Sequence, residues 1–176
     1  MPVAPCYALC ANSGEKVVTI AARLKELGLL LPAPPKIPPG VVLPFGWVRI
    51  VGTRALVSGH GPTNLDGTFA KPLGRVGSEV TQQDAYGAAR LTALAVLASL
   101  ERELGDLDRI LAWTRVFGMV QAAPGFHNMP SVINGFSDLI LEVFGPERGR
   151  HARSAVGVAS LPFGIPVEIE AEVEIA

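Results

Sequence analysis

Cysteine, long apolar runs and an excess of either charge are all scarce in this chain of 176 residues. The only two cysteines are Cys6 and Cys10, and two thiolates cannot complete a tetrahedral zinc site without distant ligands. We therefore expect free thiols, no metal site and no cofactor. No run of 18 apolar residues occurs, and the N-terminal stretch lacks the charged and continuous apolar regions of a secretory signal. These absences predict a soluble, cytoplasmic protein that does not contact a membrane.

The charge balance argues against a protein that binds nucleic acid. Fifteen Lys and Arg residues face 16 Asp and Glu residues, which gives a net charge of −1. Proteins that bind nucleic acid usually carry a strongly basic patch or stripe, so the composition argues against a nucleic-acid partner. A hydrophobic content of 49% over this length fits one domain with a well-formed core.

The first 40 residues differ from the rest. We expect residues 1–15 to be mobile, and residues 16–27 carry apolar side chains at helical spacing up to Gly28, a natural helix stop. Residues 31–40 contain five prolines, which favour an extended connector. The main domain is therefore expected to begin at Val41.

The middle of the chain alternates between strand and helix patterns. Residues 47–59 indicate two short strands around a turn. A capping box predicts a long helix over 81–105, and a run of β-branched and aromatic residues predicts a central strand at 110–121. An apolar stripe then predicts a second helix over 130–145. This order indicates an α+β domain with two helices on one face of a sheet.

The last two strands are predicted to form an antiparallel hairpin from residues 153–160 and 167–175, with Ser160 opposite Val167. Strict alternation places four glutamates on the face away from the helices, at positions 168, 170, 172 and 174. In this register Arg153 shares that face. This face of the sheet is either a solvated surface or, because the facing strand carries small residues, an interface between subunits.

Four motifs carry a resemblance to a known family: VSG at 57–59, VING at 132–135, HARS at 151–154 and LPFGIPVEIEA at 161–171. In this order they resemble the Rid family of reactive-intermediate deaminases, also called YjgF-like, and in particular its longer endoribonuclease-like branch. The resemblance covers roughly residues 41–176. It implies a single chorismate-mutase-like α+β domain, with a mixed sheet and two helices on one face. It also implies a homotrimer with a site in each cleft between subunits.

The resemblance assigns roles to four residues. Arg153 would grip the carboxylate of a substrate, and Glu168 would position the hydrolytic water. Asn134 would line the cleft, with Ser58 beside it. From the pattern alone, Asn134 could equally be a solvated residue, and Arg153 could merely neutralise the acidic row.

Three positions depart from the family pattern. Phe45 stands where many members have a tyrosine, His60 replaces a glutamine, and Ala155 replaces a cysteine found in some relatives. Phe45 and Ala155 would still line the substrate site. His60, His127 and His151 lack metal-binding spacing, and we expect each of them in a turn or at the surface.

The leading hypothesis is a hydrolytic deaminase of enamines or imines that carry a carboxylate. The planar guanidinium of Arg153 suits a carboxylate, and Glu168 suits water activation if its pKa lies near the working pH. A non-catalytic trimer that binds a small carboxylate metabolite is the alternative, and an endoribonuclease comes third. In the predicted register Arg153 and Glu168 are six residues apart along the strand, or ~20 Å, so they could serve one site only across subunits.

Overall fold

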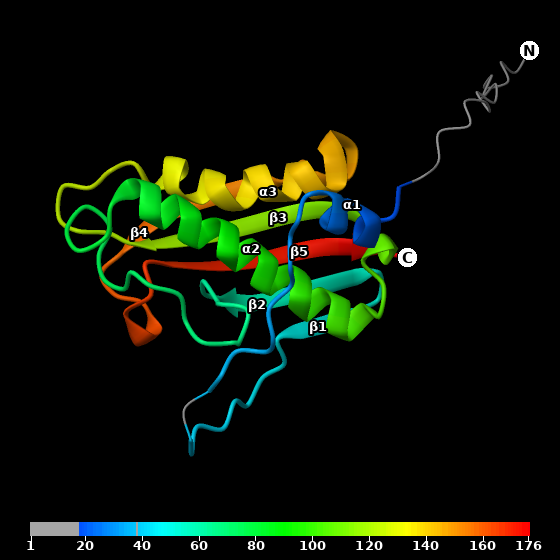
Figure 1. The fold of residues 1–176 in the computed structure, drawn as a ribbon, viewed down its shortest axis with the longest axis horizontal. Coiled ribbons are helices and arrows are strands. Elements are labelled where there is room, and N and C mark those ends of the chain that lie inside the picture. Colours follow the sequence, from blue (N-terminus) through cyan, green and yellow to red (C-terminus); the bar gives the residue numbers. More distant parts are fainter. Residues whose placement is uncertain (1–17, 38) are drawn as a thin grey trace, which may run out of the picture.

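The computed structural model describes residues 18–37 and 39–176. In this part, three helices lie over one face of a five-stranded mixed sheet, as Figure 1 shows. The expectations about residues 1–15, Cys6, Cys10 and the first residues of the N-terminal helix lie outside the described residues. The helices are α1 (Ile20–Glu26), α2 (Gln82–Leu104) and α3 (Met129–Gly149). The strands are β1 (Val48–Val51), β2 (Arg54–His60), β3 (Ile110–Gln121), β4 (Ala152–Val158) and β5 (Val167–Ile175).

The two long helices begin and end where local chemistry predicts. The Thr81 hydroxyl caps α2 by accepting from the backbone N–H of Asp84 at 3.1 Å, and Gly105 ends this helix with a φ of 77°. In α3 the regular helix breaks at Gly145, which has a φ of 71° and a ψ of 174°, and a further turn continues to Gly149. Both helix predictions are confirmed, with this short extension of the second.

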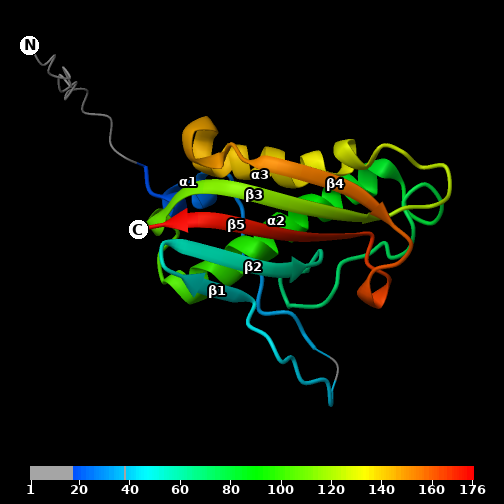
Figure 2. The same cartoon turned by 180° about the vertical axis from the view of Figure 1, so that it is seen from behind.

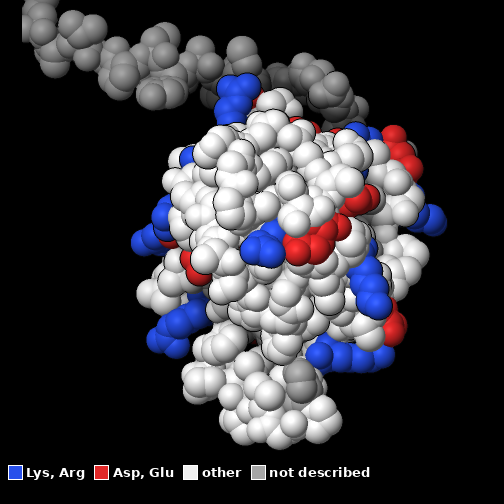
Figure 3. Space-filling view, turned by 90° about the vertical axis from the view of Figure 1, so that its left-hand side faces the viewer, with Lys and Arg blue, Asp and Glu red and all other residues white. Residues whose placement is uncertain are grey.

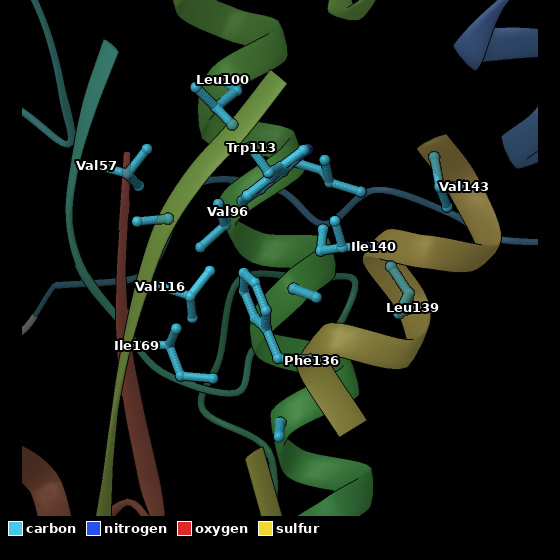
Figure 4. Packing of buried hydrophobic residues seen from close by; sticks show 14 of the residues in the cluster. Val57, Val96, Leu100, Trp113, Val116, Phe136, Leu139, Ile140, Val143 and Ile169 are labelled. Atoms are coloured by element: carbon cyan, nitrogen blue, oxygen red, sulfur yellow. The ribbon is translucent and has the colours of Figure 1, made fainter. Parts of the chain in front are cut away.

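The core lies between α2, α3 and the sheet, and Figure 4 shows Trp113 beside Phe136 at its centre. These two rings pack edge to face with centroids 5.8 Å apart. Gly135 allows the two helices to approach closely, because a Cβ there would lie 2.1 Å from the carbonyl oxygen of Tyr86. A glycine at this point therefore fixes the spacing of α2 and α3.

The N-terminal segment joins the same core. Ile20 and Leu24 of α1 are buried in it, and the Asp108 carboxylate accepts from the backbone N–H of Ile20 at 3.1 Å. The proline-rich connector is tied to the loop after β2, where Ala33 donates to the Leu65 carbonyl at 3.0 Å. The predicted helix is thus present over 20–26, and the connector lies against the domain.

The predicted terminal hairpin is wrong. The strand order is β1-β2-β5-β3-β4, so β3 lies between β4 and β5, and Ser160 is not paired with Val167. The connection at 159–166 is long enough to cross a strand, because next-but-one strands lie only about 10 Å apart. β3 runs parallel to β4, with α3 as the crossover between them, and antiparallel to β5.

The corrected order also reverses the predicted face of β4. Arg153 is paired with Val116, which is buried beneath the helices, so Arg153 and Ala155 lie on the helix side of the sheet. The glutamates of β5 do lie on the opposite face, as predicted, because Val167 and Ile169 are fully buried. Figure 2 shows this opposite face, which no element of the described chain covers. Arg153 and the acidic row therefore lie on different faces.

Candidate functional site

Arg153 anchors the first of two groups of polar side chains, which we call the arginine half-site (Asn134, Ser137, His151 and Arg153). Arg153 lies on edge strand β4, and its Nη1 donates to Asn134 Oδ1 at 2.9 Å and to Ser137 Oγ at 3.0 Å. Its Nη2 makes a longer contact of 3.4 Å with the Pro130 carbonyl. Among the described residues no acceptor is bonded to its Nε. The Nε and Nη2 edge can thus donate two parallel hydrogen bonds to a carboxylate.

His151 supports this arginine through Ser137. The His151 Nδ1 lies 2.7 Å from the Gly149 carbonyl, which can only accept, so Nδ1 carries the proton. The Ser137 hydroxyl then donates to Nε2 over 3.0 Å and accepts from Arg153. Burial lowers the pKa of His151, which favours this neutral form. The histidine is half-buried and hydrogen-bonded, not a solvent-facing turn residue as expected.

Glu168 belongs to the second group, the acid half-site (Phe45, Ser58, Gly59, His60 and Glu168). A register shift interrupts β2 between Val57 and His60, and the Glu168 carboxylate lies over the bulge. A Cβ at Gly59 would lie 2.1 Å from Glu168 Oε1, so glycine leaves room for the carboxylate in this position. Burial raises the pKa of Glu168, and the neighbouring charge of Glu170 raises it further.

His60 holds the bulge in place. It is 1% exposed, and its Nδ1 lies 2.7 Å from the Ser58 carbonyl while its Nε2 lies 2.8 Å from Ser99 Oγ. Burial lowers the pKa of His60 to about 4, so the ring is neutral at pH 7. The expectation of a surface histidine is wrong here, because the bulge turns residue 60 inward where strict alternation would have turned Gly59.

Ser58 and Phe45 line the acid half-site from the other side. The Ser58 hydroxyl donates to the Gly46 carbonyl at 2.8 Å, which fixes the strand end against the chain at Phe45. The Phe45 ring packs edge to face on Trp47 at 5.6 Å. An apolar pocket of about 230 Å³ opens beside Glu168, with Phe45 and Trp47 in its wall.

One chain does not bring the two half-sites together. Arg153 is paired with Val116 of β3 and Glu168 with Met119 of the same strand, so their α-carbons are about 14 Å apart and their side chains point to opposite faces of the sheet. Of the predicted site residues, the structure groups Asn134, Arg153 and Ala155 near the β4 edge. It groups the other three, Phe45, Ser58 and Glu168, at the β2 bulge. The predicted separation of ~20 Å rested on the wrong register, but the two groups are separate.

The helices and the surface charge of the described chain help to define which class of protein it is. None of its helices is long and apolar enough to cross a membrane. On the face seen in Figure 3, blue and red side chains are scattered over an uncharged surface with no continuous basic track. Together, the strand order, the one-sided helices and the two polar half-sites define a YjgF-like α+β domain.

Comparison with known proteins gives the family. A sequence model described as "YjgF/chorismate mutase-like, putative endoribonuclease" matches residues 22–166. Protein TCP17 of Trypanosoma cruzi is 42% identical over 158 residues, which cover 89% of this chain and 94% of that protein. This chain therefore belongs to the YjgF/chorismate mutase-like family, as its motifs indicated.

Solved structures agree in fold. Atu1372 from Agrobacterium tumefaciens, a protein of unknown function, is 42% identical with a TM-score of 0.78, covering 90% of this chain and 94% of that one. A "putative endoribonuclease" from Shewanella oneidensis is 30% identical with a TM-score of 0.80, covering 89% and 99%. RidA from an Antarctic Psychrobacter is only 19% identical, with a TM-score of 0.54 over 82% and 94% of the two chains, and shares the fold alone.

Proposed function

We propose that this protein is a hydrolytic deaminase of enamines or imines that carry a carboxylate, with each site assembled between two subunits of a homotrimer. One observation carries the proposal. A single sheet presents an arginine on one face, whose Nε and Nη2 edge can donate to a carboxylate, and a half-buried carboxylate of raised pKa on the other. A ring of identical subunits joins two different patches at each contact, so Arg153 of one subunit can meet Glu168 of the next.

The chemistry assigns each half-site a task. An enamine first takes a proton from solvent on carbon and becomes an iminium ion. Glu168 accepts a proton from a water molecule whose oxygen forms a bond to the iminium carbon. That proton passes to nitrogen, the carbon–nitrogen bond breaks as the new hydroxyl group releases its proton to solvent, and a 2-keto acid and ammonia leave. A carboxylate with a pKa raised by burial suits this role, because it is a stronger proton acceptor than an exposed carboxylate.

Arg153 would hold the substrate carboxylate during these steps. Asn134 and Ser137 occupy both protons of Nη1, which leaves the opposite edge to face a ligand. The guanidinium remains charged even though burial lowers its pKa. A fixed bidentate contact places the reacting carbon in one position, which is how positioning lowers a barrier.

A non-catalytic trimer that binds small carboxylates is the second candidate, and Phe45 favours it. Phe45 has no hydroxyl to donate a proton, and the Ser58 hydroxyl is engaged with the Gly46 carbonyl. Glu168 is then left as the acid–base group of the acid half-site, because His60 is buried and neutral. An endoribonuclease activity, which the family description names, has less support from this chain because the surface in Figure 3 carries no basic track.

The direct test uses an enamine generated in the cuvette. A dehydratase acting on serine supplies 2-aminoacrylate, and the protein should accelerate the release of ammonia. Arg153→Ala and Glu168→Gln should each remove most of this acceleration. Arg150→Ala and Glu174→Gln are matched controls, since both side chains are exposed and belong to neither half-site, and they should retain it. Binding of 2-keto acids that depends on Arg153, without turnover of any imine, would select the non-catalytic trimer instead.

A further inference from the structure

We propose that the apolar pocket beside Glu168 receives the side chain of the substrate, so that the preferred substrates are imines of amino acids with bulky branched or aromatic side chains. This inference rests on the proposed deaminase function and specifies its substrate. The pocket has a volume of about 230 Å³, and its wall includes Val41, Leu43 and Phe45 from the segment after the proline-rich connector. Glu168 lies in the same wall.

The pocket is held open by fixed contacts of the backbone. The Lys36 N–H donates to the Gly67 carbonyl at 2.8 Å, which fastens the connector to the loop after β2. Gly67 has a φ of 87°, and a Cβ there would lie 2.3 Å from the Pro34 carbonyl oxygen. This close approach needs glycine, and it sets the position of the wall that the connector builds.

The far wall is aromatic. Phe163 stacks on Phe69 with ring centroids 4.9 Å apart, and both rings line the pocket. Phe163 is the one non-glycine residue with positive φ, 58°, among residues 18–37 and 39–176. A bulky residue in this region of the backbone is strained, and such strain is found where the position of the side chain serves a site. Here it keeps an aromatic ring over the pocket.

The size and lining of the pocket define the ligand group. An apolar cavity of about 150 Å³ is large enough to bind benzene, so 230 Å³ can hold a phenyl or branched alkyl group. The wall of the pocket contains two titratable side chains, Glu168 and the neutral His60. An uncharged apolar group is therefore favoured in the interior. With that group inside, the reacting carbon lies at the Glu168 rim and the substrate carboxylate points away, toward Arg153 of the next subunit.

The experiment compares imines of graded side-chain size. An amino-acid oxidase generates them from alanine, leucine and phenylalanine, and kcat/KM is measured for each. The leucine and phenylalanine imines should react at least about tenfold better than the alanine imine, since each buried methylene contributes severalfold or more. Val41→Trp, which fills the pocket, should abolish this preference.

The neighbouring residue supplies the control. Val42 is 85% exposed and is not in the pocket wall, so Val42→Trp should keep the preference. If Val41→Trp fails to fold, Phe163→Ala removes the aromatic wall and should reduce the same preference. Equal kcat/KM for all three imines, or equal effects of the two tryptophans, would overturn the pocket inference and leave the deaminase function standing.

A different result is expected if the proposed deaminase function is wrong. If the protein accelerates no imine, the deaminase proposal fails, and the pocket is then tested by calorimetry with 4-methyl-2-oxopentanoate and pyruvate. Tighter binding of the larger keto acid, lost in Val41→Trp, would support the pocket. Equal binding of the two acids, or a crystal structure of the oligomer with a neighbouring side chain in the pocket, would overturn it.

Discussion

Mixing two inactive variants should restore activity, because the two half-sites lie on opposite faces of one sheet. Arg153→Ala lacks the arginine half-site and Glu168→Gln lacks the acid half-site, so each variant alone is expected to be inactive. A mixed oligomer can place an intact Arg153 next to an intact Glu168 from a neighbouring subunit. Within one chain this cannot occur, because the two α-carbons are about 14 Å apart and their side chains point to opposite faces of the sheet.

The expected yield follows from random assembly in a closed ring. In an equal mixture, half of the subunits bring an intact Arg153 to a site and, independently, half bring an intact Glu168. About one site in four therefore receives both, so the activity should reach roughly a quarter of the wild-type value. The fraction does not depend on the number of subunits in the ring. A site contained in one chain would show no restored activity, since every chain carries one inactivating substitution.

The assay needs proof that the subunits have mixed. The two variants can be co-expressed with tags of different mass, and native mass spectrometry of the unselected oligomers then counts the subunits of each kind. Deamination of 2-aminoacrylate is then compared with each homogeneous variant and with the wild type. Mixed oligomers without activity would refute the shared site, and so would a monomer in light scattering.

Two further predictions use other features of the structure. Glu170→Gln removes a charge that helps to raise the pKa of Glu168, so that pKa should fall and the acidic limb of the pH–rate profile should move to lower pH. Glu174→Gln, at the far end of the strand, should leave the limb in place, and an unmoved limb in both variants would contradict the coupling. Gly135→Ala should lower the free energy of unfolding by about 1–3 kcal/mol through overpacking of the helices, whereas Gly87→Ala, with open space around it, should raise it by roughly 0.5–1 kcal/mol. Thermal unfolding monitored by circular dichroism measures both, and equal melting temperatures would refute the packing argument.

Local signals predicted the elements of this fold well, because each is decided within a few residues. The capping hydroxyl of Thr81 and the positive φ of Gly105 delimit α2 as the sequence indicated. The alternation of β5 also placed its valines and isoleucines inside correctly. Strand order was not predictable in this way. Two strands joined by a short turn-rich segment usually pair, and nothing within residues 153–175 indicates that β3 lies between them.

The candidate site was likewise predicted only where local motifs decide it. The motifs identified Arg153 and Asn134, and the structure joins them by a hydrogen bond, but the face assigned to Arg153 was wrong. An arginine at an edge strand can lie on the helix side because its long side chain reaches the polar end of α3. Ser137 lies three residues after Asn134 on one helix, so helical spacing could have found it. Phe163 belongs to the motif at 161–171, but its role in the pocket was not predicted, since that contact depends on how the chain folds back.

The position of β5 in the middle of the sheet has a consequence for folding. β5 pairs with β2 on one side and with β3 on the other, so before it is synthesised the chain can form only two separate pairs, β1–β2 and β3–β4. Each pair exposes a long unpaired edge, which is a template for aggregation. The cooperative sheet therefore forms only after residues 167–175 leave the ribosome. A nascent chain that stalls before this strand is an expected client of chaperones.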